Sequence, residues 1–244
     1  PRATRASWAR ALLWLFGFAL VFRLVYIAES ARNPLFGAHL VDAADYDRWA
    51  GEIAGGAWVQ GKLRDHLPIY PFFLAIVKLA FGSAPIVLKW VQAILGAATA
   101  VLLAATAARA WDRRVGLTAG ALYATHWVAV VYGAEAFAET FCVFFQSLAL
   151  LLLAARAASV GWMFLAGLSY ALAAGTRVNL LLAFPFLLAW LVWRHWGRRA
   201  TAGRAAAAFV LGAAVLFGPI LVHNRRISGM WILRAHTSAS LYVG

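Results

Sequence analysis

Long apolar runs, interrupted only by short arginine-containing turns, are the feature that most restricts how this chain can fold. Hydrophobic residues make up 64% of the 244 positions, and the mean hydropathy is +0.76, more than a water-exposed surface accommodates. In lipid a chain must satisfy its backbone hydrogen bonds internally, and continuous apolar runs favour helices over alternating strands. The sequence therefore predicts an all-α polytopic membrane protein.

About 20 apolar residues are needed for a helix to cross a bilayer, and this length defines about seven crossings. The predicted spans are 11–28, 86–108, 115–133, 140–158, 161–176, 178–193 and 205–222. The run 69–82 has only 14 residues and contains Lys78, so we interpret it as an interfacial helix that does not cross. His126, inside the third span, is interpreted as a hydrogen-bonded core residue.

The layout that follows is a single transmembrane domain over residues 1–244. A first span at 11–28 leads into a long outer loop, 29–84, that carries interfacial helices, and six further spans occupy 86–222. Residues 223–244 begin the next outer loop, and because no polar tail follows, we expect the protein to continue.

The distribution of charge predicts the orientation of this domain. With the N-terminus in the cytoplasm, the cytoplasmic segments carry 11 of the 22 basic residues and a single acid, Asp112, while eight acids share the other segments. This asymmetry follows the positive-inside rule, and it would reverse if 69–82 crossed the membrane. Because the basic residues are dispersed between spans, topology explains the net charge of +13 better than nucleic-acid binding does.

The polar interval after the first span concentrates carboxylates and is the predicted centre of function. Residues 42–54 predict a short amphipathic helix with Asp42, Asp45, Tyr46 and Trp49 on one side. The aromatic pair would anchor this helix in the membrane interface, while Asp47 would point to solvent. Asp42 is the main candidate for a chemical role, and it also suits a helix N-cap.

Basic residues follow this helix. Lys62, Arg64 and His66 precede the turn Pro68-Ile-Tyr70-Pro, which either presents cations to a phosphate or is a solvated loop. Tyr46, His66 and Tyr70 are further site candidates.

Later segments predicted on the same outer face add charged residues. Glu135 and Glu139 either mark the membrane boundary or face the same aqueous mouth as Asp42. Arg177 either snorkels or binds phosphate, and Arg225 is a second cation there. Two carboxylates do not make a metal site by themselves, so the sequence leaves a divalent metal open.

Several segments, in order across the chain, resemble the GT-C membrane glycosyltransferases, and most closely the bacterial dolichyl-phosphate-mannose protein mannosyltransferase-like group related to the lipid A aminoarabinose transferase. The segments are F-R-L-V-Y (22–26), D-A-A-D-Y-D-R-W-A (42–50), L-P-I-Y-P-F-F-L-A (67–75), V-Q-A-I-L-G (91–96), G-A-E-A-F-A-E-T (133–140), G-L-S-Y-A-L-A-A-G-T-R-V-N (167–179) and N-R-R-I-S-G (224–229). Ile69 and Val178 stand where such proteins usually have Leu and Pro.

This resemblance implies an enzyme of the inner membrane that moves a sugar from a polyprenyl-phosphate donor onto a protein, lipid or glycan acceptor at the periplasmic face. Asp42 matches the essential acid of the first outer loop and would act as the general base, with Asp45 and Glu139 as further catalytic candidates. By position, Arg177, Lys62, Arg64 and Arg225 would hold the donor phosphate. A transporter and a non-catalytic assembly subunit are the alternatives; against a transporter, no inverted repeat is apparent and charge gathers at one face.

Overall fold

The computed structural model describes residues 5–34, 36–37, 42–58, 61, 63–155 and 159–234, and within these residues all regular secondary structure is helical, as predicted. The elements are α1 (Arg5–Ser30), α2 (Asp42–Ala54), α3 (Ile69–Phe81), α4 (Pro85–Ala110), α5 (Arg113–Thr125), α6 (Trp127–Gly133), α7 (Glu139–Ala155), α8 (Val160–Ala174), the 3₁₀ helix η1 (Val178–Ala183), α9 (Phe184–Arg194) and α10 (Arg199–Ser228).

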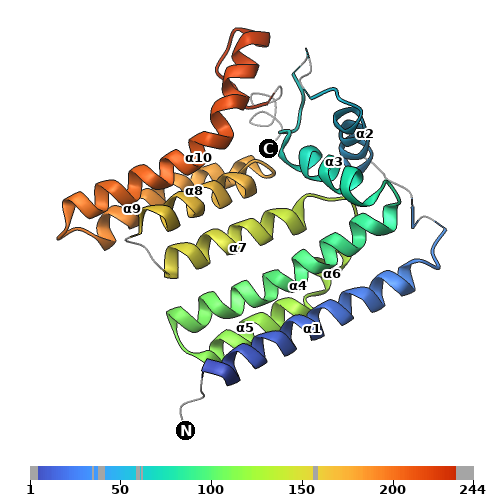
Figure 1. The fold of residues 1–244 in the computed structure, drawn as a ribbon, viewed down its shortest axis with the longest axis horizontal. Coiled ribbons are helices and arrows are strands. Elements are labelled where there is room, and N and C mark those ends of the chain that lie inside the picture. The colour runs from blue at the N-terminus through green and yellow to red at the C-terminus, as the bar shows by residue number, and fades with distance from the viewer. Residues whose placement is uncertain are drawn as a thin grey trace.

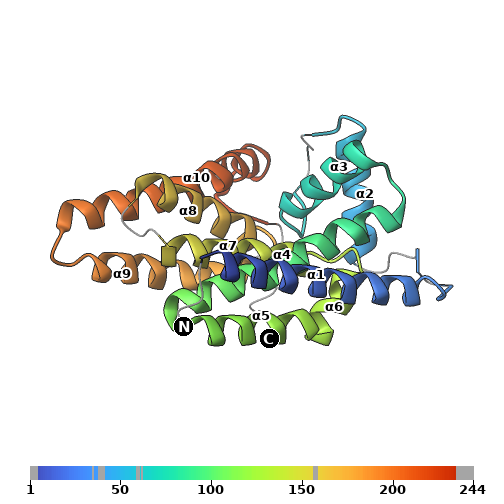
Figure 2. The same cartoon turned by 60° about the horizontal axis from the view of Figure 1, so that its bottom comes forward.

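The long segments run back and forth between two ends of the molecule (Figure 1). The α4–α5 and α9–α10 turns lie at the end where the described chain starts, whereas the α6–α7 and α8–η1 links lie at the other. The α2–α3 unit stands off the helical layer at this second end (Figure 2). The segments that the charge count placed together on one face therefore also meet at one end of the structure.

Three helices, α1, α4 and α10, are long and apolar enough to cross a membrane, and the bent pair α5–α6 would make a fourth span. The apolar helices α3, α7, α8 and η1 with α9 are shorter. The structure thus supports a helical membrane protein but does not confirm about seven crossings, and the domain layout stays a prediction. Large apolar side chains exposed around the bundle, among them Trp14, Leu182 and Phe186, suit contact with lipid.

The predicted span 115–133 is broken at His126, where the axes of α5 and α6 differ by 54°. His126 is exposed, and its Nδ1 accepts a hydrogen bond from the Ala129 amide at 3.3 Å, so its interpretation as a core residue is wrong. Arg23 of α1 is buried and donates to the Ala124 carbonyl at 3.2 Å, a group in the last turn of α5. A side-chain donor from a neighbouring helix thereby satisfies a backbone carbonyl that has lost its helical partner at the break.

Helices α8 and α10 pack closely because glycines line their contact. A Cβ added at Gly212 of α10 would press on the Phe164 carbonyl of α8, and one at Gly167 would press on the Phe209 carbonyl of α10. Small residues at such positions let two apolar helices approach through their backbones. This packing fixes the end of α8, from which the chain turns into the Arg177 link.

We expect Gly212→Ala to lower the thermal melting temperature of the detergent-solubilised protein, because overpacking a tight contact costs about 1–3 kcal/mol. Gly203→Ala, in the same helix, is the matched control. A Cβ there meets nothing within 4 Å, and the gain in helix propensity is up to about 1 kcal/mol. Equal melting temperatures for the two variants would contradict the close contact of α8 and α10.

Candidate functional site

The α2–α3 unit presents the acidic side chains of the candidate site. Tyr46, Trp49 and Ile53 of α2 are buried in one cluster with Tyr70 and Leu74 of α3. The predicted helix over 42–54 is confirmed with these bounds, and its apolar face follows the helical period. The expected role of Tyr46 and Trp49 as membrane anchors is wrong, because both rings face protein.

Asp47 was predicted to point to solvent, but the structure pairs it with α3. Its Oδ1 lies 2.8 Å from Nζ of Lys78, which also donates to the Asp47 carbonyl at 3.1 Å. Both side chains are partly buried. The pair is thus a direct contact between α2 and α3. Lys78 thus holds α3 to α2. This role is consistent with α3 being too short to count as a candidate span.

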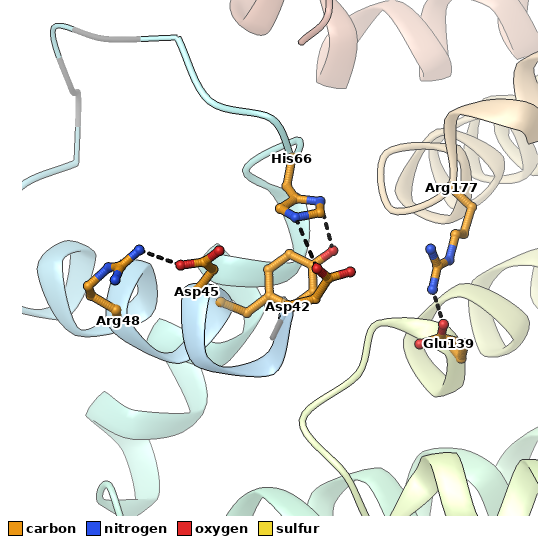
Figure 3. A network of polar contacts seen from close by, with 7 residues as sticks. Asp42, Asp45, Arg48, His66, Glu139 and Arg177 are labelled. Carbon is orange, nitrogen blue, oxygen red and sulfur yellow. Dashed lines mark hydrogen bonds and ion pairs between the residues drawn. The ribbon is translucent and has the colours of Figure 1, made fainter. Parts of the chain in front are cut away.

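Asp42, in the first turn of α2, lies beside His66, which precedes α3 in the chain (Figure 3). Its Oδ1 is 3.7 Å from Nε2 of His66, and the other ring nitrogen, Nδ1, is 3.2 Å from the Tyr46 hydroxyl in a hydrogen bond. Asp42 and His66 remain partly exposed, whereas Tyr46 is buried. The structure therefore groups three of the predicted site residues, and solvent or a substrate can reach the carboxylate.

Burial raises the pKa of the Tyr46 phenol above its ordinary value; the Asp42 carboxylate adds to the rise, the positive charge of Arg177 opposes it, and Asp45 adds a smaller rise. The hydroxyl therefore stays protonated at neutral pH. A neutral hydroxyl both donates and accepts hydrogen bonds, so it suits either protonation state of His66.

Two other residues of the predicted site take part in ion pairs near this group. Asp45 pairs with Arg48 one helical turn later, at an exposed position. Arg64 pairs with Glu52, and its guanidinium carbon lies 4.5 Å from the centre of the Trp49 ring. Both contacts hold Arg64 against α2, which is a local structural role that the sequence did not indicate.

Arg177 and Glu139 form an ion pair opposite the Asp42 group (Figure 3). Glu139 is the first residue of α7, and Arg177 precedes η1, so the pair joins the α6–α7 and α8–η1 links. Both side chains are partly exposed. A guanidinium has five N–H donors, so Arg177 can hold Glu139 with one edge and still offer donors to an anion.

A buried polar cluster fixes the α6–α7 link, which carries Glu135. Gln92 of α4 accepts from the Tyr70 hydroxyl at 2.9 Å and donates to the carbonyls of Gly133 and Glu135. Lys89, one turn earlier in α4, donates to the Ala134 carbonyl and lies 3.7 Å from the Glu135 carboxylate. Burial raises the pKa of Tyr70 well above its ordinary range, so its hydroxyl remains a donor. Sequence reasoning missed Lys89 and Gln92, although two polar residues in a predicted span were a usable signal.

Arg225 and Lys62 are the remaining predicted phosphate ligands. The Arg225 guanidinium lies 5.8 Å from the Trp231 ring at the end of α10. Lys62 lies outside the described residues.

A pocket of about 230 Å³ separates the α2–α3 unit from the end of α10. Its walls include Trp49, Trp58 and Phe72 on one side and Ile220 on the other, and His66 also lines it. A largely apolar pocket with a few polar groups is typical of a small-molecule site. Among the described residues, no three His, Cys, Asp or Glu side chains lie close enough together to hold a metal ion.

Carboxylates, a histidine and an arginine thus meet at one end of an apolar helical bundle, beside a pocket. The sequence model of the family described as dolichyl-phosphate-mannose-protein mannosyltransferase matches residues 65–223, well over half of the chain. The chain belongs to this family, as its motifs indicated. His66, Glu139 and Arg177 lie within the matched range, whereas α2 precedes it. No curated protein and no solved structure matches the chain.

We expect Gln92→Leu to destabilise the protein by about 2 kcal/mol, because it leaves the buried Tyr70 hydroxyl and two carbonyls without their partner. Thermal melting in detergent would measure this loss. Gln146→Leu in α7 is the control: this side chain is only partly buried, and the expected change is within about 0.5 kcal/mol. Equal losses would show that the cluster at Gln92 does not hold the link.

Proposed function

We propose that this protein transfers a sugar from a polyprenyl phosphate to an acceptor hydroxyl, with inversion at the anomeric carbon and with Asp42 as general base. Membership of the mannosyltransferase family carries this proposal, because it links the chain to enzymes that use a lipid-phosphate sugar donor. The reaction takes place at the end that holds α2 and Arg177. In the proposed orientation, this is the periplasmic face of a bacterial inner membrane, and the N-terminus is cytoplasmic.

The surroundings of Asp42 support its role as the base. A carboxylate paired with an arginine is held in its charged form and accepts a proton less readily. Asp45 and Glu139 both have such arginine partners, whereas Asp42 faces His66. Asp42 is also partly exposed, so an acceptor hydroxyl can approach within hydrogen-bond distance.

Arg177 supplies the charge that the leaving phosphate needs. When the bond from the anomeric carbon to the phosphate oxygen breaks, the phosphate gains a second negative charge, and a fixed guanidinium stabilises it. Glu139 would act by holding Arg177 in place rather than by taking a proton. Arg225 and Lys62 would add charge from the neighbouring segments. The apolar flanks of the bundle suit the prenyl chain, whose burial contributes about 0.8 kcal/mol per CH₂.

The test of Asp42 compares Asp42→Asn and Asp42→Ser with the unaltered full-length protein, using labelled mannose on dolichyl or undecaprenyl phosphate as the donor and a peptide or glycoside hydroxyl as the acceptor. Asn and Ser both suit the start of a helix but neither is a useful base. We expect both variants to lose transfer by about 100-fold or more, the ordinary contribution of a general base.

The control is Glu29→Gln, a carboxylate of α1 in an exposed ion pair with Arg32 outside the α2–α3 unit, and it should change transfer little. Full activity in both Asp42 variants would remove Asp42 from the mechanism. No transfer by the unaltered protein, with any lipid-phosphate sugar in a panel of hexoses and pentoses, would favour an assembly subunit.

For Arg177, the informative substitutions are Arg177→Lys and Arg177→Gln. Lysine keeps a charge but not the planar fork, so transfer should fall in both variants and further in Arg177→Gln, with the loss appearing in KM for the donor as well as in kcat. Arg32→Gln serves as the control, because Arg32 forms an exposed ion pair with Glu29 beyond the end of α1. Unchanged donor KM in Arg177→Gln would exclude Arg177 from phosphate binding.

A further inference from the structure

The proposed transfer releases a proton, and the site must dispose of it. A polyprenyl-phosphate sugar is a phosphodiester with one negative charge, and the leaving lipid phosphate is a monoester whose second ionisation has a pKa of about 6. At neutral pH each transfer therefore frees most of one proton. A carboxylate that has taken this proton from the acceptor cannot serve the next cycle until it has passed it on.

His66 lies where such a proton would go. The ring has Nε2 at 3.7 Å from the Asp42 carboxylate and Nδ1 at 3.2 Å from the Tyr46 hydroxyl. When Nδ1–H donates to Tyr46, Nε2 keeps its lone pair toward Asp42 and can accept. At 3.7 Å, one bridging water or a small rotation of either side chain is enough for a proton to pass from Asp42 to Nε2.

His66 lines two pockets of different character. One is the largely apolar pocket of about 230 Å³ between the α2–α3 unit and α10. The other is a second pocket, about 200 Å³ in volume, whose lining includes four charged residues, Asp45, Arg48, Arg64 and Asp65. Polar walls hold water, so a proton on His66 has an aqueous exit away from the apolar side.

We infer that His66 is the proton-relay residue of this site: it takes the acceptor's proton from Asp42 and passes it to water in the charged pocket. This role rests on the proposed function. Each transfer forms the bond from acceptor oxygen to anomeric carbon, breaks the bond from that carbon to the phosphate oxygen, and leaves the electron pair on the phosphate. The proton moves from the acceptor to Asp42, then to Nε2 of His66, then to solvent.

Several titratable or charged groups surround the His66 ring, and each can contribute to the pH dependence of the transfer rate. They are Asp42, Asp45, Tyr46 and Arg48 of α2, Arg64 and Asp65 of the loop, Tyr70 of α3 and His223 of α10. Asp42 pairs with the His66 ring. The relay therefore predicts that transfer slows on the acid side as His66 takes up a proton, because a protonated ring cannot accept another.

The experiment measures kcat for transfer from dolichyl or undecaprenyl phosphate mannose between pH 5 and 9 in the full-length protein and in His66→Asn, His66→Gln and His66→Ala. Asn places an amide near the position of Nδ1 and Gln near that of Nε2, so both keep a hydrogen bond, but neither titrates. We expect kcat at neutral pH to fall by about tenfold or more. The acid limb that imidazole produces should disappear in both amide variants, and added imidazole should restore part of the rate in His66→Ala.

The control is His195→Gln in the α9–α10 turn, at the opposite end of the molecule, which should keep the unaltered pH profile. An unaltered profile in His66→Asn and His66→Gln would overturn the relay and leave the proposed function intact. A loss of rate with the acid limb kept and no rescue by imidazole would also overturn it, since that result indicates a structural role. An inactive unaltered protein would overturn the proposed function, and the relay with it.

Discussion

The buried polar cluster around Lys89 and Gln92 is the interaction on which the positions of α3 and of the α6–α7 link depend. Both side chains lie in α4 and are almost completely buried, where an unsatisfied polar group is costly. Their donors go to the carbonyls of Gly133, Ala134 and Glu135, in a link whose backbone is largely not helical. Irregular backbone at the edge of an apolar bundle is tolerated where protein groups satisfy it. Because Tyr70 also bonds to Gln92, one helix fixes both the α3 side and the Glu139 side of the site.

The carboxylates at this end of the molecule differ in the kind of partner that each one has. Three arginines are matched with carboxylates: Arg48 with Asp45, Arg64 with Glu52 and Arg177 with Glu139. Asp42 has a histidine as its partner, whose charge depends on pH. A carboxylate that faces a titratable ring can exchange a proton with it, whereas one that faces an arginine cannot. The proposed proton transfer rests on the pair of Asp42 and His66, and the proposed phosphate binding rests on Arg177.

Local patterns predicted much of this fold, and tertiary contacts account for what they missed. The bounds of α2 followed from the spacing of its apolar residues, and the shortness of α3 from the length of its run. The break at His126 has no Pro or Gly beside it in sequence, and the Ala124 carbonyl next to it accepts a hydrogen bond from Arg23, 101 positions away. Likewise, the pairing of Arg177 with Glu139 joins residues 38 apart, which spacing along one helix cannot reveal. The sequence could nominate these side chains but not their partners.

Asp42 lies outside the matched family segment, but residues inside that segment hold it in place. The match begins at residue 65, and α2 ends before it. Three contacts cross that boundary: the Tyr46 ring packs edge-on against Tyr70 at 5.1 Å, Asp47 pairs with Lys78, and Asp42 faces His66. Their partners all lie on or next to α3, which Gln92 ties to the bundle. The matched segment therefore holds the Asp42 carboxylate beside His66, and α2 itself contributes an amphipathic helix with two acids in its first turn.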